Sequence, residues 1–277
     1  MTRPRRFANS GQKTVRHLPR WMMPVILIVL CFLAVWLLPP FRLQAVLVPE
    51  DMHSLTREDL LTALDIPLGR HLFAELGGSL PLLLGLRYGR AETQLKAQYP
   101  VIRDVVVEMA FPGRVEISLS ERVEVAWLTV PDGCVMIDKE GVALKINSQA
   151  PQGIPVIEGV HVHSMILGQP LTVDVSEALN RAIGLLGAII EADRDPRPAT
   201  VLLPRVSSIR PLSGHQLYMV LVIPETGEEI TVLTERYPEQ AEDMLWLRFA
   251  LDQAALAGRG KGILDLTGGG RTFIPDA

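Results

Sequence analysis

Polar and apolar positions follow three successive patterns along this chain. The first is an apolar run, residues 21–38, that contains no charged side chain. As a helix it would cover about 27 Å, close to the roughly 30 Å hydrocarbon core of a bilayer, and it would bond its own backbone groups there. Trp21 and Trp36 lie near its two ends, where amphipathic rings favour the headgroup level. Two prolines follow, so we expect a transmembrane helix within residues 21–40.

The second pattern, over residues 41–120, consists of short periodic elements. Two stretches, 105–110 and 115–120, alternate apolar and polar positions around the turn sequence Phe111-Pro112-Gly113, which predicts an antiparallel hairpin with one buried face. In chain order the predicted elements are a strand at 41–48, a helix capped by Ser54 or Thr56 that ends near Leu64, a helix at 91–98, and the two hairpin strands. This β-α-α-β-β order predicts one small domain with a packed core.

The third pattern, over residues 121–277, is a longer series of strands with two helices. The predicted strands lie at 123–130, 134–137, 142–146, 201–209, 217–223, 230–233, 262–267 and 271–274. The predicted helices run from Asp174 or Ser176 to about Ala192, and from near Pro238 through the apolar positions 245, 247, 249 and 251, which are expected to face the sheet. The expected fold class is a single transmembrane helix plus an α+β ectodomain, in which the β-α-α-β-β domain precedes a β-rich domain with flanking helices.

The charge distribution predicts the orientation of the apolar run. The chain carries a net charge of −4, yet the charged residues of the tail 1–20 are all basic: Arg3, Arg5, Arg6, Lys13, Arg16 and Arg20. The positive-inside rule keeps such a tail in the cytoplasm and sends the acidic remainder across the membrane. The alternative, a cleaved signal peptide, would have a shorter apolar stretch and a small-x-small cleavage site. Leu43-Gln44-Ala45 puts a leucine where a small residue is needed, so we expect an uncleaved anchor in the cell membrane.

Composition and motifs argue against nucleic-acid binding and against catalysis. The acidic balance outside the tail disfavours nucleic acid as a partner. Cys31 lies within the apolar run and Cys134 outside it, so the two cannot form a disulfide or a thiolate metal site. The sequence contains neither a G-x-S-x-G nor an HExxH motif. We expect no catalytic residue, no cofactor, no metal and no small-molecule ligand.

Three further signals favour structural roles. His161 and His163 fall on the same side of an expected strand, but zinc sites need three or four ligands and the sequence has no third ligand at a recognisable spacing. Gly268-Gly269-Gly270 follows a strand but opens no helix, so it cannot present a helix N-terminus to phosphate. Glu121-Arg122 is expected to form a charge pair where the first domain meets the second.

The order of these segments resembles the FtsQ/DivIB proteins of the bacterial division machinery. The resemblance extends over nearly the full length and rests on the basic tail, the single span and a series of motifs: Phe111-Pro112, Val115, Ile117, Glu121-Arg122, Val125-Ala126, Ile137-Asp138, Gly141-Val142 and the turn Gly153-Ile-Pro-Val-Ile-Glu-Gly159. It implies a POTRA domain over 41–120, the family's β domain over 121–277, and a non-catalytic scaffold for septum formation.

The last strand is the candidate functional site. A strand placed last in a sheet tends to be an edge, and its unpaired N–H and C=O groups can bond another chain. In the FtsQ/DivIB family this region receives FtsB or DivIC, which forms a bitopic complex with FtsL, so the resemblance implies these partners and a location at the division septum. The residues expected to contact a partner are Leu266, Thr267, Gly268, Arg271, Thr272 and Phe273.

One segment departs from the family pattern. Residues 77–90 insert an apolar stretch that is too short and too interrupted to span a bilayer. One hypothesis is an interfacial segment that lays leucines such as Leu82 and Leu84 on the outer leaflet. The alternative, which the pattern favours, is a longer core helix or a strand-like cover over the first sheet.

Two other functions are compatible with the same pattern. A membrane-anchored POTRA protein for polypeptide handling or transport would share the fold of the first domain. A tethered cell-wall hydrolase or metal enzyme is the second alternative, but it would need a convergent set of polar residues that the sequence does not offer.

Overall fold

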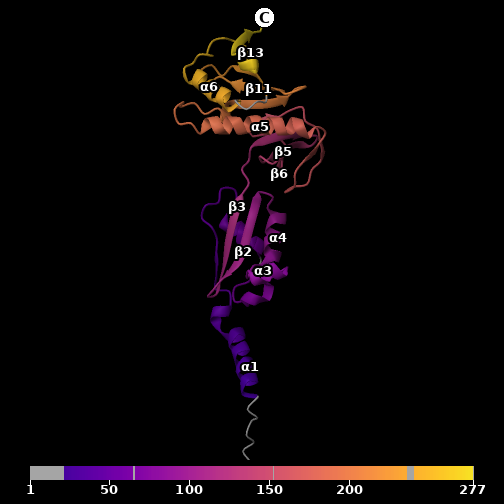
Figure 1. Ribbon diagram of the computed structural model, residues 1–277, viewed down its shortest axis with the longest axis vertical. Helices are drawn as coiled ribbons and strands as arrows, with labels where there is room; N and C mark the ends of the chain where they lie inside the picture. The colour runs from indigo at the N-terminus through magenta and orange to yellow at the C-terminus, as the bar shows by residue number, and fades with distance from the viewer. Residues whose placement is uncertain (1–21, 65, 152, 236–239, 277) are drawn as a thin grey trace, which may run out of the picture.

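The computed structural model describes residues 22–64, 66–151, 153–235 and 240–276. Figure 1 shows an elongated molecule with a helix at one end and the C-terminal strand at the other. The basic tail, Trp21 and Pro238 lie outside the described residues, and the expectations stated for them lie there too.

The helix at the first end, α1, covers Met22–Leu37, and none of its residues is buried. A 3-10 turn, η1 (Pro39–Phe41), follows it, so the helix expected within residues 21–40 ends before the pair of prolines. The reason is that proline cannot donate the backbone bond that a continuing helix requires. Within the described residues, no helix combines the length and the apolar character needed to cross a membrane.

A small domain with a three-stranded sheet follows α1. Its elements are β1 (Ala45–Leu47), α2 (Arg57–Leu64), η2 (Leu72–Glu75), α3 (Leu80–Leu84), α4 (Gly89–Gln98), β2 (Ile102–Ala110) and β3 (Arg114–Glu121). β3 lies between a parallel β1 and an antiparallel β2. Leu60 of α2 and Leu95 of α4 share one hydrophobic cluster with Val107 and Ile117 of the sheet. The β-α-α-β-β order is therefore observed, with the short helices η2 and α3 added.

The first strand of this domain is shorter than the expected 41–48. Phe41 belongs to the 3-10 turn, and the N–H of Leu43 donates to the carbonyl oxygen of Arg70 at 2.8 Å instead of extending the strand. The β propensity of the segment is thus overridden by the turn that the prolines impose.

The insertion at 77–90 does not form a core helix. α3 is a short helix, and Leu84 at its end is 78% exposed. The residues after it run beside β2, where the N–H of Tyr88 donates to Val107 at 2.8 Å and the N–H of Met109 donates to Leu86 at 2.9 Å. The expectation of a longer core helix is therefore wrong, and residues 86–88 pair with the edge strand β2 instead of covering a face of the sheet.

The large domain is built on a nine-stranded mixed sheet with the order β14-β13-β12-β11-β10-β7-β4-β5-β6. Its strands are β4 (Ala126–Val130), β5 (Gly133–Ile137), β6 (Ala143–Asn147), β7 (Val156–Ile157), β10 (Val206–Pro211), β11 (Gln216–Val222), β12 (Glu229–Glu235), β13 (Gly262–Asp265) and β14 (Thr272–Pro275). The strands β8 (Val162–Ser164) and β9 (Thr172–Val173) form a separate pair. The other elements are α5 (Ser176–Asp193), η3 (Leu203–Arg205), α6 (Gln240–Asp252) and η4 (Thr267–Gly269).

Both long helices contribute to the core of the large domain. Leu185 of α5 and Leu247 of α6 belong to the same hydrophobic cluster as Met219 and Val232 of the central strands. The buried apolar positions of α6 are Met244, Leu247, Ala250 and Leu251. Of the positions expected to face the sheet, Leu247 and Leu251 are buried in the core and Leu245 packs against it, whereas Phe249 does not belong to this cluster. The expectation for Phe249 is wrong because a helix repeats its buried face every three to four residues and not every two.

The strand expected at 123–130 begins at Ala126, and the strand expected at 262–267 ends at Asp265. Two further strands of the large sheet also differ from the expected pattern. The strand expected at 201–209 begins only at Val206, since the backbone N–H groups of Leu202 and Leu203 donate to the carboxylate of Asp193, at 2.8 and 2.9 Å, and η3 follows. β7 was not expected as a strand, yet it joins β4 to β10 through parallel pairings. It comprises 2 residues, too few to show a period.

Candidate functional site at the C-terminal sheet edge

The C-terminal strand is an edge of the large sheet. β14 pairs with β13, and within the part of the chain that the structure describes no strand lies on its other side. The opposite edge of the sheet is β6. Figure 1 places β13 and the C-terminus at the end of the molecule farthest from α1. The edge is therefore held away from the first helix by the length of both domains.

The register determines which backbone groups of β14 point outward. β14 is antiparallel to β13, and just beyond it the N–H of Asp276 donates to the carbonyl oxygen of Lys261 at 3.0 Å. Bonded and non-bonded pairs alternate along an antiparallel ladder, so Thr272 and Ile274 also bond toward β13. Phe273 therefore directs its N–H and C=O away from the sheet, where another chain could reach them.

Pro275 follows Ile274 in β14 and limits this free edge. It occupies a non-bonded position of the ladder, opposite Gly262, and proline carries a carbonyl oxygen but no N–H. A strand added to β14 could therefore receive a bond from Phe273 and donate to Phe273 and Pro275. The edge offers more acceptors than donors near its end.

The side chains of β14 divide between two faces. Phe273 is half-buried against the core, with the guanidinium of Arg259 5.8 Å from the centre of its ring. Arg271, just before the strand, lies 4.6 Å over the ring of Trp246 in α6. Its Nη2 also lies 3.3 Å from Oδ1 of the buried Asp243. Thus α6 holds the inner face of the edge strand in place.

The outer face of β14 carries exposed side chains. Thr272 and Ile274 alternate with Phe273, and both are exposed. Ile274 was not among the residues expected to contact a partner, although the alternation of a strand places it beside Thr272 on one face. That period could have found it in the sequence.

The residues before β14 form a fixed turn and not a free loop. Leu266 is fully buried and its N–H donates to the carbonyl oxygen of Leu233 at 2.9 Å, so its side chain is part of the core and does not reach the surface. The N–H and hydroxyl of Thr267 donate to Asp265 at 2.8 and 2.7 Å. The N–H of Gly268 donates to Oε1 of Glu235 at 2.9 Å. Of the expected contact residues, Leu266 is therefore misplaced as a surface residue.

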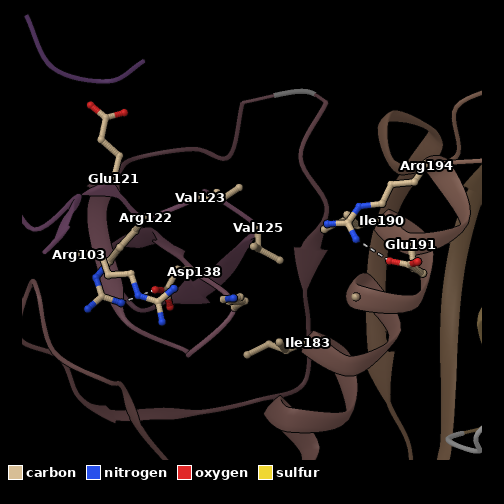
Figure 2. A pocket seen from close by; sticks show the side chains of 12 residues that line it. Arg103, Glu121, Arg122, Val123, Val125, Asp138, Ile183, Ile190, Glu191 and Arg194 are labelled. Atoms are coloured by element: carbon tan, nitrogen blue, oxygen red, sulfur yellow. Dashed lines mark hydrogen bonds and ion pairs between the residues drawn. The ribbon is translucent and has the colours of Figure 1, made fainter. Parts of the chain in front are cut away.

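The junction between the two domains holds a network of charges. Arg122 pairs with Asp138 at 2.6 Å and with Glu140 at 3.0 Å. Arg103 also pairs with Glu140. Figure 2 shows Arg103 and Arg122 beside Asp138, whereas Glu121 points away from them. A pocket of about 340 Å³ lies between this network and α5.

The expected charge pair between Glu121 and Arg122 is not formed. The Glu121 carboxylate instead accepts backbone N–H groups from His53, Ser54 and Leu55, at 3.0–3.3 Å, just before α2. Neighbours on a strand point to opposite faces, so two consecutive residues cannot share one partner site easily. Glu121 therefore stabilises the segment before α2, whereas Arg122 stabilises the turn after β5.

The two histidines do not gather further ligands. His161 precedes β8 and His163 lies within it, and the backbone N–H of His161 donates to Oδ1 of Asp174 at 3.2 Å. Across the described ranges, no group of three or more His, Cys, Asp or Glu side chains could hold a metal ion.

Of the comparisons with known proteins, only the one with solved structures finds matches. No family model matches the chain, and no curated protein matches it. Among solved structures, the chain is similar to the major extracytoplasmic domain of the trans isomer of the bacterial cell division protein DivIB from Geobacillus stearothermophilus, with 18% sequence identity and a TM-score of 0.30. The match covers 50% of this chain and 97% of that chain.

Proposed function

We propose that this chain is a membrane-anchored, non-catalytic scaffold of the bacterial division machinery that captures another polypeptide by β-strand addition at β14. The observation that carries the proposal is the edge position of β14 at the end of the molecule opposite α1. The resemblance of the sequence to FtsQ/DivIB proteins supports FtsB/DivIC-like and FtsL-like bitopic proteins as the partners.

The apolar run supports the anchor. Residues 21–38 carry no charge, and no side chain of the part described as α1 is buried in the protein. A surface that is apolar on all sides needs an apolar environment, because in water it would remain exposed at a free-energy cost proportional to its area. The basic tail 1–20 favours an orientation with the ectodomain outside the cytoplasm.

Backbone and side chains of β14 would contribute differently to capture. A backbone hydrogen bond contributes about 0.5–1.5 kcal/mol, so the few outward groups near Phe273 fix direction and register but cannot hold a partner by themselves. The exposed Thr272 and Ile274 add a surface against which alternate side chains of the added strand can pack. We therefore expect a partner segment with an apolar residue opposite Ile274.

A pair of substitutions at one position tests strand addition. Phe273→Pro removes the outward N–H together with the ring, whereas Phe273→Ala removes the ring alone. An edge strand tolerates proline where its N–H faces outward, so both variants should fold. In co-purification of the full chain with FtsB/DivIC-like and FtsL-like candidates, Phe273→Ala should retain part of the capture, and Phe273→Pro should capture up to about tenfold less than Phe273→Ala.

Two outcomes would contradict the proposed function. Equal capture by Phe273→Pro and Phe273→Ala would show that the backbone edge is not the binding element. A fluorescent fusion spread evenly over the membrane in dividing cells, rather than concentrated at midcell, would argue against a division role and favour polypeptide handling.

A further inference from the structure

A group of exposed apolar side chains lies on the small domain at the end that faces α1. Leu84 is 78% exposed and Phe111 is 61% exposed. The group, which we call the collar, consists of Phe73, Leu80, Leu84, Leu86 and Phe111. Soluble proteins seldom expose several large apolar side chains together without a partner for them.

Aromatic contacts fix the collar directly against the end of α1. Phe41 lies 5.3 Å from Phe111 and 6.2 Å from Phe73, measured between ring centres. His71 stacks on Trp36 of α1 at 4.7 Å, and its Nε2 lies 3.1 Å from the carbonyl oxygen of Val35. The exposed side chains therefore begin where the apolar helix ends.

The leucines of the collar belong to the same end of the domain. The N–H of Met109 donates to the carbonyl oxygen of Leu86 at 2.9 Å, which places Leu86 beside the last residues of β2 before the Phe111 turn. Figure 1 shows α3 in the half of the small domain nearer to α1. Phe111 and Leu84 thus extend the apolar surface of α1 sideways onto the small domain.

We propose that the collar lies in the headgroup region of the bilayer that holds α1, so that the small domain rests on the lipid surface. The proposal depends on the membrane anchor of the proposed function. It commits to lipid as the occupant because the collar is continuous with the all-apolar surface of α1. The exposed Arg42 and Arg114 beside Phe41 and Phe111 are placed to meet anionic headgroups.

A hollow between α1 and the collar supports the same occupant. It has a volume of about 590 Å³ and is lined by Phe32, Trp36, Phe73 and other side chains of α1 and the loop at His71. An open hollow with apolar walls is unfavourable in water. Lipid chains or headgroup carbons would fill it in a bilayer.

Lipid contact at the collar would control the tilt of the ectodomain. Interfacial segments bury their apolar side chains by about 5–10 Å into the headgroup boundary. With α1, Phe111 and Leu84 giving separate points of contact, the long axis of the molecule could not tip freely about a single helix.

Site-specific fluorescent probes on the full chain test this proposal in vesicles that contain anionic lipid. A polarity-sensitive dye is attached to a single cysteine: the native Cys31 in α1, Leu84→Cys or Phe111→Cys in the collar, and Val123→Cys as the control. Cys134 is replaced by Ser in every protein, and Cys31 is replaced by Ser in the last three. Leu84, Phe111 and Val123 are all exposed, and Val123 lies at the domain junction, so the three substitutions that introduce a cysteine do not disturb a core. Cys134→Ser, which changes a half-buried residue, is common to all four proteins.

The expected result is a blue-shifted emission at both collar positions and at least about twofold quenching there by lipids with a nitroxide near the headgroup. The Val123→Cys probe should remain unquenched. Quenching at Cys31 without quenching at the collar positions would contradict the lipid contact of the collar but would be consistent with the membrane anchor. A blue shift at the collar positions without quenching by lipid would show that protein covers the collar, and it would also contradict the proposed lipid contact. A Cys31 probe that nitroxides in the acyl chains leave unquenched would overturn the membrane anchor and, with it, the proposed lipid contact of the collar.

Discussion

Nη1 of Arg122 lies 2.6 Å from Oδ2 of Asp138, and this ion pair joins the end of the small domain to the start of the large one. The side chains of Arg122 and Asp138 are only 14% and 4% exposed. Asp138 also accepts N–H groups from Glu140 and Val142 through its other oxygen. The carboxylate therefore holds the turn after β5 and the arginine at the same time.

Replacement of Arg122 by Ala should lower the free energy of unfolding by about 2–3 kcal/mol, because the buried Asp138 would lose its charged donor. Arg103→Ala is the matched control: its pair with Glu140 is about half exposed, and its loss should cost no more than about 1 kcal/mol. Urea unfolding of both variants measures the difference. Equal small effects would mean that the backbone donors alone satisfy Asp138.

Arg248 is the most deeply buried charge described in the large domain, with 2% of its surface exposed. It pairs with Asp193 at 3.0 Å and donates to the carbonyl oxygens of Ala192, Asp195, Pro198 and Thr200 around the C-terminal end of α5. Arg248→Met should therefore reduce the free energy of unfolding by about 3–5 kcal/mol, since it leaves buried acceptors without donors.

The control for Arg248 is Arg194→Met, at an exposed residue near the same helix end. Its effect should stay within about 0.5 kcal/mol. Thermal and urea unfolding of the two variants should rank them in this order. A stable Arg248→Met variant would indicate that Met fills the space and that the carbonyl groups find other donors.

Gly262 lets β14 lie close to β13. A Cβ atom at this position would come within 2.5 Å of the carbonyl oxygen of Ile274 and 2.7 Å of the ring of Phe273. Gly262→Val should therefore push β14 off the sheet without unfolding the domain. Brief trypsin digestion should then cleave after Arg271, and mass spectrometry would detect the shortened chain.

Gly184→Ala provides the comparison for Gly262→Val, because a Cβ atom at Gly184 in α5 meets nothing within 4 Å. This variant should resist cleavage after Arg271 as well as the wild type does. If Gly262→Val is equally resistant, the contact between β13 and β14 is looser than its geometry indicates.

Thr56 and Asp59 form a reciprocal cap at the start of α2. The Thr56 hydroxyl and N–H donate to Oδ2 of Asp59 at 2.6 and 2.9 Å, and the N–H of Asp59 donates to Oγ1 of Thr56 at 3.2 Å. The hydroxyl bond, followed by the backbone bond, lowers the pKa of Asp59 below its ordinary value. The cap therefore stabilises the fold above the unfolded-state pKa of about 4, and this contribution is lost as the pH falls through the lower folded-state pKa.

NMR titration of the Asp59 carboxyl measures this effect. Thr56→Ala should raise the pKa of Asp59 toward its ordinary value and should lower stability at neutral pH by about 1 kcal/mol. The stability difference between wild type and variant should shrink in strong acid. A difference that does not change with pH would contradict the role of the Asp59 charge.

The sequence predicted best those elements whose apolar period is long and uninterrupted. The hairpin strands at Val105–Val107 and Val115–Ile117 were correct because alternate positions face a core and water. α5 was correct within a residue or two for the same reason, with the helical period. Here a single buried face dictates both the element and its orientation.

The sequence does not predict ion pairs and hydrogen bonds between residues that lie far apart in the chain. Arg122 and Glu121 are adjacent in sequence, yet their partners are Asp138 in one direction and the backbone at 53–55 in the other. No local pattern encodes such pairings. β7 was missed because a strand of its length exists only through its neighbours in the sheet.

At the candidate site, strand order was easier to anticipate than side-chain exposure. The place of β14 in the chain predicts its terminal position in the sheet, whereas Leu266, which the sequence pattern places at the surface, is buried. Its burial depends on the parallel pairing of β13 with β12, which positions the end of β13 over the core. That pairing cannot be read from the last residues alone.

The separation of α1 and β14 at opposite ends of the molecule has a consequence for recruitment. In an anchored chain, β14 stands above the lipid surface by the full height of both domains. A second protein embedded in the same bilayer can meet it only if its own stalk rises equally far. The length of a partner's extramembrane segment, and not its sequence alone, would then determine which membrane proteins can bind β14.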